Sequence, residues 1–126
     1  MTERELLERT KQFALRIFKL VGALPQTIQG RAVAAQLIRS GPSVAANYRG
    51  ACRARPKPEF VAKLGVVEEE ADESAFWLEL IMETNLLSAT KVKPLLSEAS
   101  EIVAIMASSK KTAAKSQIAN RKSQIR

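Results

Sequence analysis

Six basic residues and no acidic one lie between residues 31 and 57 of this chain. They are Arg31, Arg39, Arg49, Arg53, Arg55 and Lys57. On a helix the first four would share an arc of about 80°, and the last two would extend this basic row into a turn. Guanidinium groups bind phosphates and carboxylates through charge-assisted, often bidentate hydrogen bonds. The basic row therefore predicts a contact surface for RNA, DNA or an acidic protein.

An alternative is that the basic row pairs with acids of the same chain. Residues 59–83 hold eight acidic residues and one lysine. Four of these acids would share one arc of a helix, namely Glu68, Asp72, Glu79 and Glu83. The sequence leaves both uses of the row open, because surface ion pairs form readily. The chain has one Tyr and no cluster of aromatic residues. We therefore expect any nucleic-acid contact to involve the phosphate backbone and to weaken with salt.

The acidic residues also admit an enzymatic interpretation. Glu69-Glu70-x-x-Glu73 is followed later in the chain by Glu98-x-x-Glu101. Carboxylates gathered on two neighbouring helices suit Mg²⁺ and a polyphosphate. The pattern resembles the EExxE motif of the all-α nucleoside triphosphate pyrophosphohydrolases, although the second motif of that family usually ends in Asp. A Mg²⁺-dependent pyrophosphohydrolase is thus the alternative function. The preferred interpretation is non-enzymatic, with no cofactor and no metal.

Nucleophilic catalysis is not expected, because the chain has no His to serve as a base for Ser43. We expect Ser43 and Asn47, four residues apart, to form hydrogen bonds across a helix contact. Cys52 is the sole cysteine and falls on an apolar helix face, which predicts a structural thiol. A single cysteine forms no internal disulfide, and this fits a cytoplasmic protein.

The first half of the chain predicts two helices. Thr2-x-x-Glu5 forms a capping box that opens the first helix, and Pro25 ends that helix near residues 22–24. The second helix is predicted over residues 27–54. It should continue with a kink through Gly41-Pro42, because the apolar face keeps the same phase on both sides of that dipeptide. The alternative is a break in which Ser40 caps a new helix.

The second half predicts a turn and two further helices. The turn is Arg-Pro-Lys-Pro at residues 55–58, and the fourth helix should begin near residues 91–94 and end near residue 110. Short loops between helices favour an antiparallel up-down four-helix bundle, here over residues 1–110. Residues 111–126 are basic and of low complexity, and we expect a disordered or partly helical tail. No apolar run approaches the roughly 20 residues of a membrane span.

The third helix is apolar on two sides. Its inward face is predicted to contain Phe60, Leu64, Val67, Ala71, Ser74, Leu78 and Ile81. A second apolar surface consists of Val66, Phe76, Trp77, Leu80 and Leu87, and the first four of these are the candidate interface residues. A helix in a small monomer buries one apolar face, so the second surface predicts contact with another copy of the chain. Trp77 is the expected anchor of that interface.

The segment QLIRSGPSVAANYRGACRARPKPEFVAKLGVVEEEADESAFWLEL resembles the proteins named for 23S rRNA intervening sequences. Their signature is Ser-x-x-x-Asn in the second helix, then a turn, and then Phe-x-x-x-Leu and a Glu in the third helix. The matching residues here are Ser43, Asn47, Phe60, Leu64 and Glu73. The resemblance covers roughly residues 10–108. The chain departs from the family at Gly50 and Ala51, where an acidic residue and a glycine are usual.

The resemblance implies a four-helix bundle that is one subunit of a homopentameric ring. Relatives include the accessory variability determinant of diversity-generating retroelements, which partners reverse transcriptase and RNA. No biochemical role is established for most members of the family. We therefore expect a cytoplasmic, oligomeric scaffold whose partners are copies of itself and a nucleic acid or an acidic protein.

Overall fold

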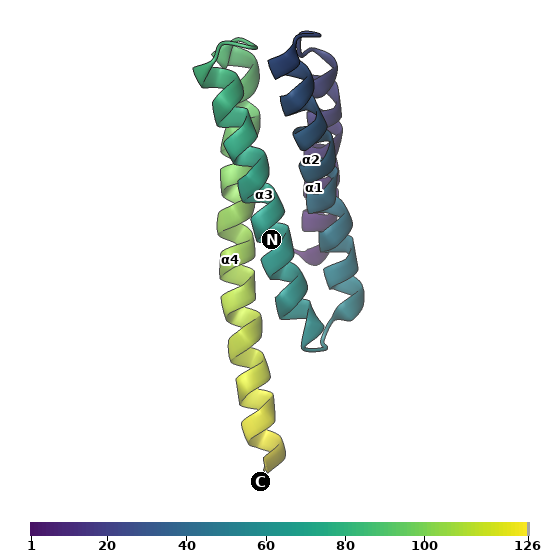
Figure 1. The fold of residues 1–126 in the computed structure, drawn as a ribbon. Coiled ribbons are helices and arrows are strands. Elements are labelled where there is room, and N and C mark those ends of the chain that lie inside the picture. The colour runs from purple at the N-terminus through teal and green to yellow at the C-terminus, as the bar shows by residue number, and fades with distance from the viewer. Residues whose placement is uncertain (126) are drawn as a thin grey trace.

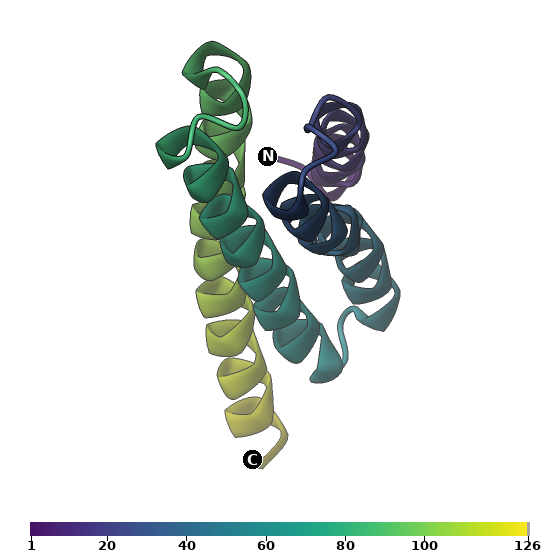
Figure 2. The same ribbon diagram turned by 45° about the horizontal axis from the view of Figure 1, so that its top comes forward.

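The computed structural model describes residues 1–125, with side chains to residue 122. Four helices follow one another in the chain: α1 (Glu3–Gly22), α2 (Ile28–Ala54), α3 (Glu59–Glu83) and α4 (Ala89–Ile125). Consecutive helices run antiparallel and pack side by side, as Figures 1 and 2 show. A sparser contact between α1 and α4 completes the bundle. The predicted all-α four-helix fold is confirmed, whereas the pentameric ring stays a prediction.

The helix boundaries follow from local capping. The Thr2 hydroxyl oxygen accepts a hydrogen bond of 3.1 Å from the Glu5 N–H, as the capping box predicts. Thr27 caps α2 in the same way through the Gly30 N–H, at 3.0 Å. The second helix continues through Pro42 as predicted. Capping therefore determines where the first two helices begin, and the phase of the apolar face carries α2 through Pro42.

Two glycines of α2 allow other parts of the chain to approach closely. A Cβ atom at Gly41 would lie 2.7–2.9 Å from three side-chain atoms of Ile17, so α1 and α2 are in close contact there. A Cβ atom at Gly30 would lie 1.9 Å from the carbonyl oxygen of Pro25. The turn between α1 and α2 therefore folds directly against the first turn of α2.

The core lies between the four helices and includes most of the predicted inward face of α3. Each helix contributes fully buried side chains, the largest of which include Phe13, Ile17, Leu37, Leu64, Leu78, Ile81, Ile102 and Met106. The core also contains a polar contact between α2 and α3. The Ser74 hydroxyl donates to the Ser40 hydroxyl at 2.9 Å, and both residues are fully buried. This bond satisfies groups that would otherwise be costly to bury.

The fourth helix does not end near residue 110, so that prediction is wrong. The helix extends to Ile125, and the segment predicted to be disordered or partly helical is helical as far as the structure describes it. The sequence after Pro94 contains neither Gly nor Pro and is rich in Ala, Lys and Ser, so nothing interrupts the helix. The domain division at residue 110 stays a prediction, and Arg126 lies outside the described residues. None of the helices in residues 1–125 combines the length and apolarity needed to cross a membrane.

A bidentate ion pair supports the sparse contact between α1 and α4. Arg9 donates from Nε and Nη2 to the two carboxylate oxygens of Glu98, each at 2.7 Å. Nη2 of Arg9 also lies 3.3 Å from Glu101. Hydrogen bonding to Glu98 raises the pKa of Arg9 further above its usual value. The pair therefore fixes the position of α1 against α4.

We expect Arg9→Met to destabilise the protein, because it leaves the largely shielded Glu98 carboxylate without its partner. Both side chains retain some contact with water, so the loss should be about 1–2 kcal/mol. Urea unfolding measures it. Arg16→Met, at an exposed position of the same helix, is the matched control and should change the free energy by less than about 0.5 kcal/mol. Equal losses in the two variants would contradict the role of the ion pair.

Candidate functional site

The structure divides the basic row into paired and exposed residues. Arg39 forms a hydrogen bond with Glu73 of α3, and its Nη1 lies 3.6 Å from Glu70 Oε2. These two acids raise the pKa of Arg39, with the Glu73 bond as the larger cause. Arg55 lies 3.2 Å from Glu3 and stacks 5.3 Å above the Phe60 ring. These two arginines are thus held within the chain.

The remaining members of the row face outward. Arg31 donates to the carbonyl oxygen of Gln26 at 2.7 Å and forms no ion pair in the described part of the chain. Arg49, Arg53 and Lys57 are exposed and likewise have no acidic partner among residues 1–122. The surface offered to an acidic partner is therefore smaller than the sequence predicted.

The predicted acidic partners of the row were the wrong ones. Arg39 pairs with α3, but with Glu70 and Glu73 instead of the predicted set of Glu68, Asp72, Glu79 and Glu83. The reason is how the helices pack. The edge of α3 that contains Ser74 faces α2, whereas Glu68 faces α4 and pairs with Lys110 at 2.8 Å.

The family-motif residues of α2 form hydrogen bonds with their own helix, and Glu73 of α3 reaches α2 through Arg39. Ser43 donates to the Arg39 carbonyl at 2.7 Å, and Asn47 Nδ2 donates to the Ser43 carbonyl at 2.8 Å. Both bonds stay within α2, so the prediction of hydrogen bonds across a helix contact is wrong for these side chains. A helical Ser or Asn reaches the carbonyl four residues earlier more easily than a second helix. The side-chain hydrogen bonds that join α2 and α3 among the described residues are Arg39–Glu73 and Ser74–Ser40, and neither was predicted.

The carboxylates of the alternative enzymatic interpretation turn toward different neighbours. Glu70 and Glu73 approach Arg39 of α2, whereas Glu98 and Glu101 approach Arg9 of α1. In the part of the chain that the structure describes, no three His, Cys, Asp or Glu side chains are grouped so that they could hold a metal ion. The arrangement gives the pyrophosphohydrolase interpretation no support.

The second apolar surface of α3 is present, and we call it the α3 ridge: Val66, Phe76, Trp77 and Leu80. Phe76 is 51% exposed and Val66 39%, while the other two are half-buried. Trp77 packs edge to face with Phe76 at 5.0 Å, and its indole N–H is buried without a hydrogen-bond partner among the described residues. Phe76 is therefore the more prominent residue of the ridge.

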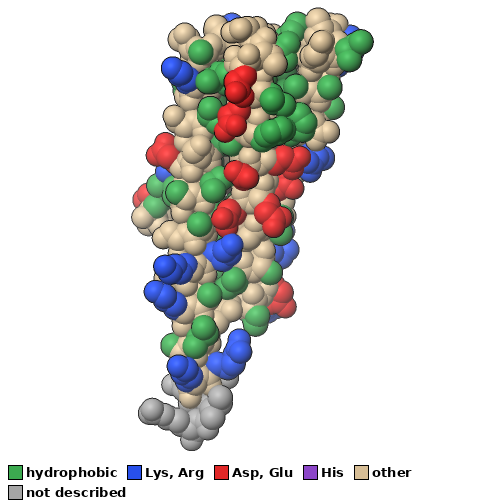
Figure 3. Space-filling view, turned by 60° about the vertical axis from the view of Figure 1, so that its left-hand side comes forward, with side chains coloured by type: hydrophobic (Ala, Val, Ile, Leu, Met, Phe, Trp, Pro, Cys, Tyr) green, Lys and Arg blue, Asp and Glu red, His purple; other side chains and the backbone are tan. Residues whose placement is uncertain are grey.

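The ridge lies in acidic surroundings. Figure 3 shows acidic side chains along the upper and middle part of the face that α3 and α4 present, with apolar side chains beside them. The exposed acids of α3 that flank the ridge are Glu69, Asp72, Glu79 and Glu83. The ridge thus combines an aromatic centre with a negatively charged border.

An apolar groove lies between α1 and α2, separate from the α3 ridge, and it was not predicted. This α1/α2 groove has a volume of about 580 Å³ and is lined by Leu7, Glu8, Lys11, Ala14, Leu15, Phe18, Pro42, Ala45, Ala46 and Arg49. Leu15 and Phe18 are 51% and 55% exposed. Both fall outside the buried positions of α1, and this off-phase placement is the sequence feature that could have revealed the groove.

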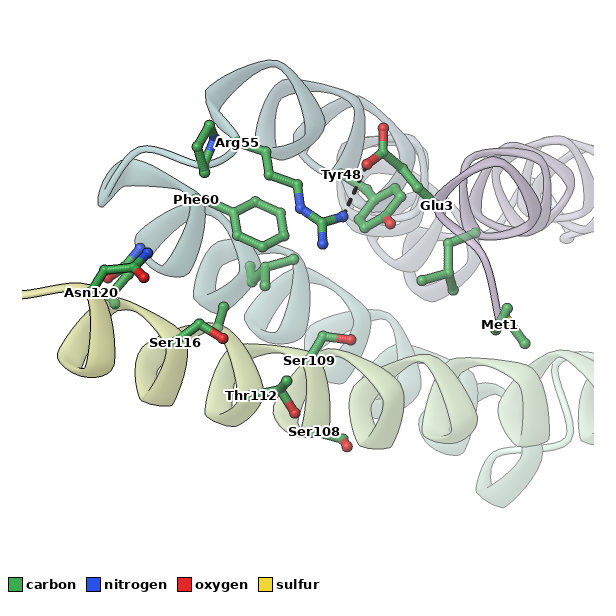
Figure 4. A pocket seen from close by; sticks show the side chains of 15 residues that line it. Met1, Glu3, Tyr48, Arg55, Phe60, Ser108, Ser109, Thr112, Ser116 and Asn120 are labelled. Atoms are coloured by element: carbon green, nitrogen blue, oxygen red, sulfur yellow. Dashed lines mark hydrogen bonds and ion pairs between the residues drawn. The ribbon is translucent and has the colours of Figure 1, made fainter. Parts of the chain in front are cut away.

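A pocket of about 400 Å³ opens at the end of the bundle where α4 extends past the other helices. Arg55, Phe60 and Tyr48 lie on one side of it, and Ser109 and Ser116 of α4 lie across from them (Figure 4). Burial raises the pKa of the Tyr48 hydroxyl and of the nearby Cys52 thiol, so both stay protonated at neutral pH. The pocket therefore presents hydrogen-bonding groups and one ion pair, without an activated nucleophile.

Comparison with known proteins places the bundle. The model of the 23S rRNA-intervening sequence protein family matches residues 2–108. A crystal structure of a protein with unknown function from the S23 ribosomal protein family of Bacteroides thetaiotaomicron has a TM-score of 0.77 and 28% sequence identity. The match covers 88% of this chain and 99% of that one. No curated protein matches the chain. On this evidence the chain belongs to the 23S rRNA-intervening sequence protein family.

Proposed function

We propose that this protein is a non-enzymatic, cytoplasmic scaffold that assembles from copies of itself. The observation that carries the proposal is the pair of exposed apolar surfaces, the α3 ridge and the α1/α2 groove, on different faces of one small bundle. Aromatic side chains with half their surface in water are costly for a monomer and are enriched at interfaces.

The two surfaces differ in form and carry opposite net charge. The ridge projects an aromatic pair, and the groove offers a hollow lined by aliphatic and aromatic side chains. The ridge is bordered by acids, whereas the lining of the groove has two cations, Lys11 and Arg49, and one acid, Glu8. We propose that the ridge of one copy docks into the groove of the next. Opposite charges at the edge would set the orientation.

A contact between two different surfaces repeats from copy to copy and closes into a ring when the rotation allows it. This geometry is compatible with the homopentamer that the family resemblance implies. Light scattering of the intact chain tests assembly: a native mass that is a multiple of 13.8 kDa supports the proposal, and the mass of one chain contradicts it.

The assembled scaffold would bind an acidic partner, nucleic acid or protein, through the exposed members of the basic row outside the groove, Arg31, Arg53 and Lys57. We expect Arg53→Gln with Lys57→Gln to lower the salt concentration at which the protein elutes from immobilised duplex RNA. The reason is that two exposed cations are lost without a change in the apolar surfaces. Arg4→Gln with Arg16→Gln removes the same charge from exposed positions of α1 and is the control. Elution of both variants at the wild-type salt concentration would remove the row from the binding surface.

A further inference from the structure

We infer that the part of α4 beyond the bundle, residues 111–122, binds the phosphate backbone of a nucleic acid. We call this segment the α4 arm. The inference concerns the acidic partner of the proposed function and rests on that part of it, but it does not depend on assembly. The family match ends at residue 108, so the arm is a feature of this chain beyond the matched segment.

The arm is positioned by the bundle. Lys110 pairs with Glu68 of α3 at 2.8 Å, directly before the arm begins. Ala113 packs against the core, and Gln117 Nε2 donates to the Lys57 carbonyl of the α2–α3 turn at 3.3 Å. Its cations are therefore presented at a defined place next to the turn that carries Lys57.

The charge of the arm is uncompensated. No acidic residue follows Glu101 in the sequence. Lys111, Lys115 and Lys122 are exposed and have no acidic partner in the described part of the chain. Figure 3 shows Lys and Arg side chains along the narrow lower end of the molecule, away from the acids above. The acidic residues of α4 therefore lie in its first part, up to Glu101, and the arm carries only basic ones.

The three lysines point the same way. At 100° per residue they share an arc of about 40°, with steps of about 6 Å and about 10 Å along the helix axis. A nucleic-acid duplex carries one negative charge per roughly 1.7 Å of its axis, so each lysine can meet a phosphate while the arm lies along the duplex. Lysines that only compensated the helix dipole would lie in the last turn, but Lys111 and Lys115 lie well before it.

The composition of the arm argues against other partners. Ile118 is its one exposed large apolar residue among the described side chains, so the arm lacks the apolar face of a membrane-surface helix. It also has no aromatic residue on which bases could stack. Binding should therefore be independent of nucleotide sequence and strongly dependent on salt. The remaining alternative partner is an acidic protein, and competition between poly-glutamate and RNA distinguishes it from a nucleic acid.

The test measures binding of fluorescein-labelled duplex RNA of mixed sequence by anisotropy over a series of salt concentrations. The arm variant is Lys111→Gln, Lys115→Gln and Lys122→Gln, in which glutamine keeps a similar helix propensity. Because each lysine contact contributes about one unit to the slope of log affinity against log salt, we expect the slope to fall by about 2–3 and the low-salt affinity by about tenfold or more. The control variant is Lys19→Gln, Lys91→Gln and Lys93→Gln, exposed lysines at the opposite end of the bundle. It should change the slope by less than about 1.

Several outcomes would overturn the inference. Equal slopes in the arm and control variants would show that the arm makes no phosphate contacts, and absence of RNA binding by the wild type would do the same. Tighter binding of poly-glutamate than of RNA at equal charge would assign the arm to an acidic protein. A lower native mass of the arm variant would assign it to assembly. If the Arg53/Lys57 variant loses RNA binding while the arm variant does not, the proposed acidic partner stands and the arm inference fails.

Discussion

A chain carrying Phe76→Glu should lose its oligomeric state and have a native mass near 13.8 kDa, the mass of one copy. Phe76 is half exposed at the prominent position of the α3 ridge, so the change places a charge in the proposed interface without opening the core. Phe18→Glu should have the same effect from the α1/α2 groove. Desolvating an unpaired carboxylate costs several kcal/mol, which exceeds what one small interface can compensate.

Mixing the two variants tests whether ridge meets groove. The Phe76→Glu chain keeps an intact groove, and the Phe18→Glu chain keeps an intact ridge. A mixture should therefore form a dimer of one copy of each, held by a single intact contact, and no larger species. Light scattering of the separate and mixed samples measures this.

Ile28→Glu is the matched control. Ile28 is 78% exposed and belongs to neither surface, so this variant should keep the native mass. A native-size oligomer for Phe18→Glu would remove the groove from the interface and leave a contact of ridge with ridge. Loss of assembly in the Ile28→Glu variant would indicate that any added acid disperses the oligomer, and the specific pairing would then be contradicted.

Gly30→Ala should destabilise the fold by about 3 kcal/mol, near the upper end for overpacking. The new Cβ would lie 1.9 Å from the Pro25 carbonyl oxygen, which is a backbone atom and cannot move aside by changing a rotamer. Relief would require the turn between α1 and α2 to shift, and Leu24 in that turn is part of the core. Denaturant unfolding at a single protein concentration measures the loss, because the proposed assembly would make stability depend on concentration.

Gly22→Ala is the opposite case. A Cβ there would meet nothing within 4 Å, and the residue lies in the last turn of α1. The substitution should leave stability unchanged or raise it by up to about 1 kcal/mol, since alanine restricts the unfolded chain. Helix propensity and chain entropy favour alanine at both positions, so similar effects of the two substitutions would contradict a special role for the close approach at Gly30.

The agreement between sequence and structure is best where a helix is specified by its own residues. The Thr2 cap, the end of α1 before Pro25 and the passage of α2 through Pro42 depend on neighbours within a few positions. The predicted inward face of α3 is buried apart from the half-buried Phe60. The family motif was also readable, because it is a matter of residue type and spacing.

The end of α4 was harder to predict, because the local sequence signals after Met106 disagree with one another. Helix propensity after Met106 is favourable, but the apolar pattern that marks a buried helix face stops there. Contacts with other parts of the chain also hold this segment. Glu68 of α3 forms an ion pair with Lys110, and the Lys57 carbonyl of the α2–α3 turn accepts a hydrogen bond from Gln117. The sequence pattern of one helix does not contain such contacts with other helices.

By itself, the sequence determined the number of helices, the cap of the first helix, the inward face of the third, and the resemblance to the family. These depend on interactions between residues close together in the chain, which spacing records. The tertiary structure alone decided that Arg39 meets Glu70 and Glu73, that Arg9 holds Glu98, and that Leu15 and Phe18 line a groove. Each depends on the rotation of one helix against another. Helical periodicity places a residue on an arc of its own helix, but only packing in the core determines which neighbouring helix that arc faces.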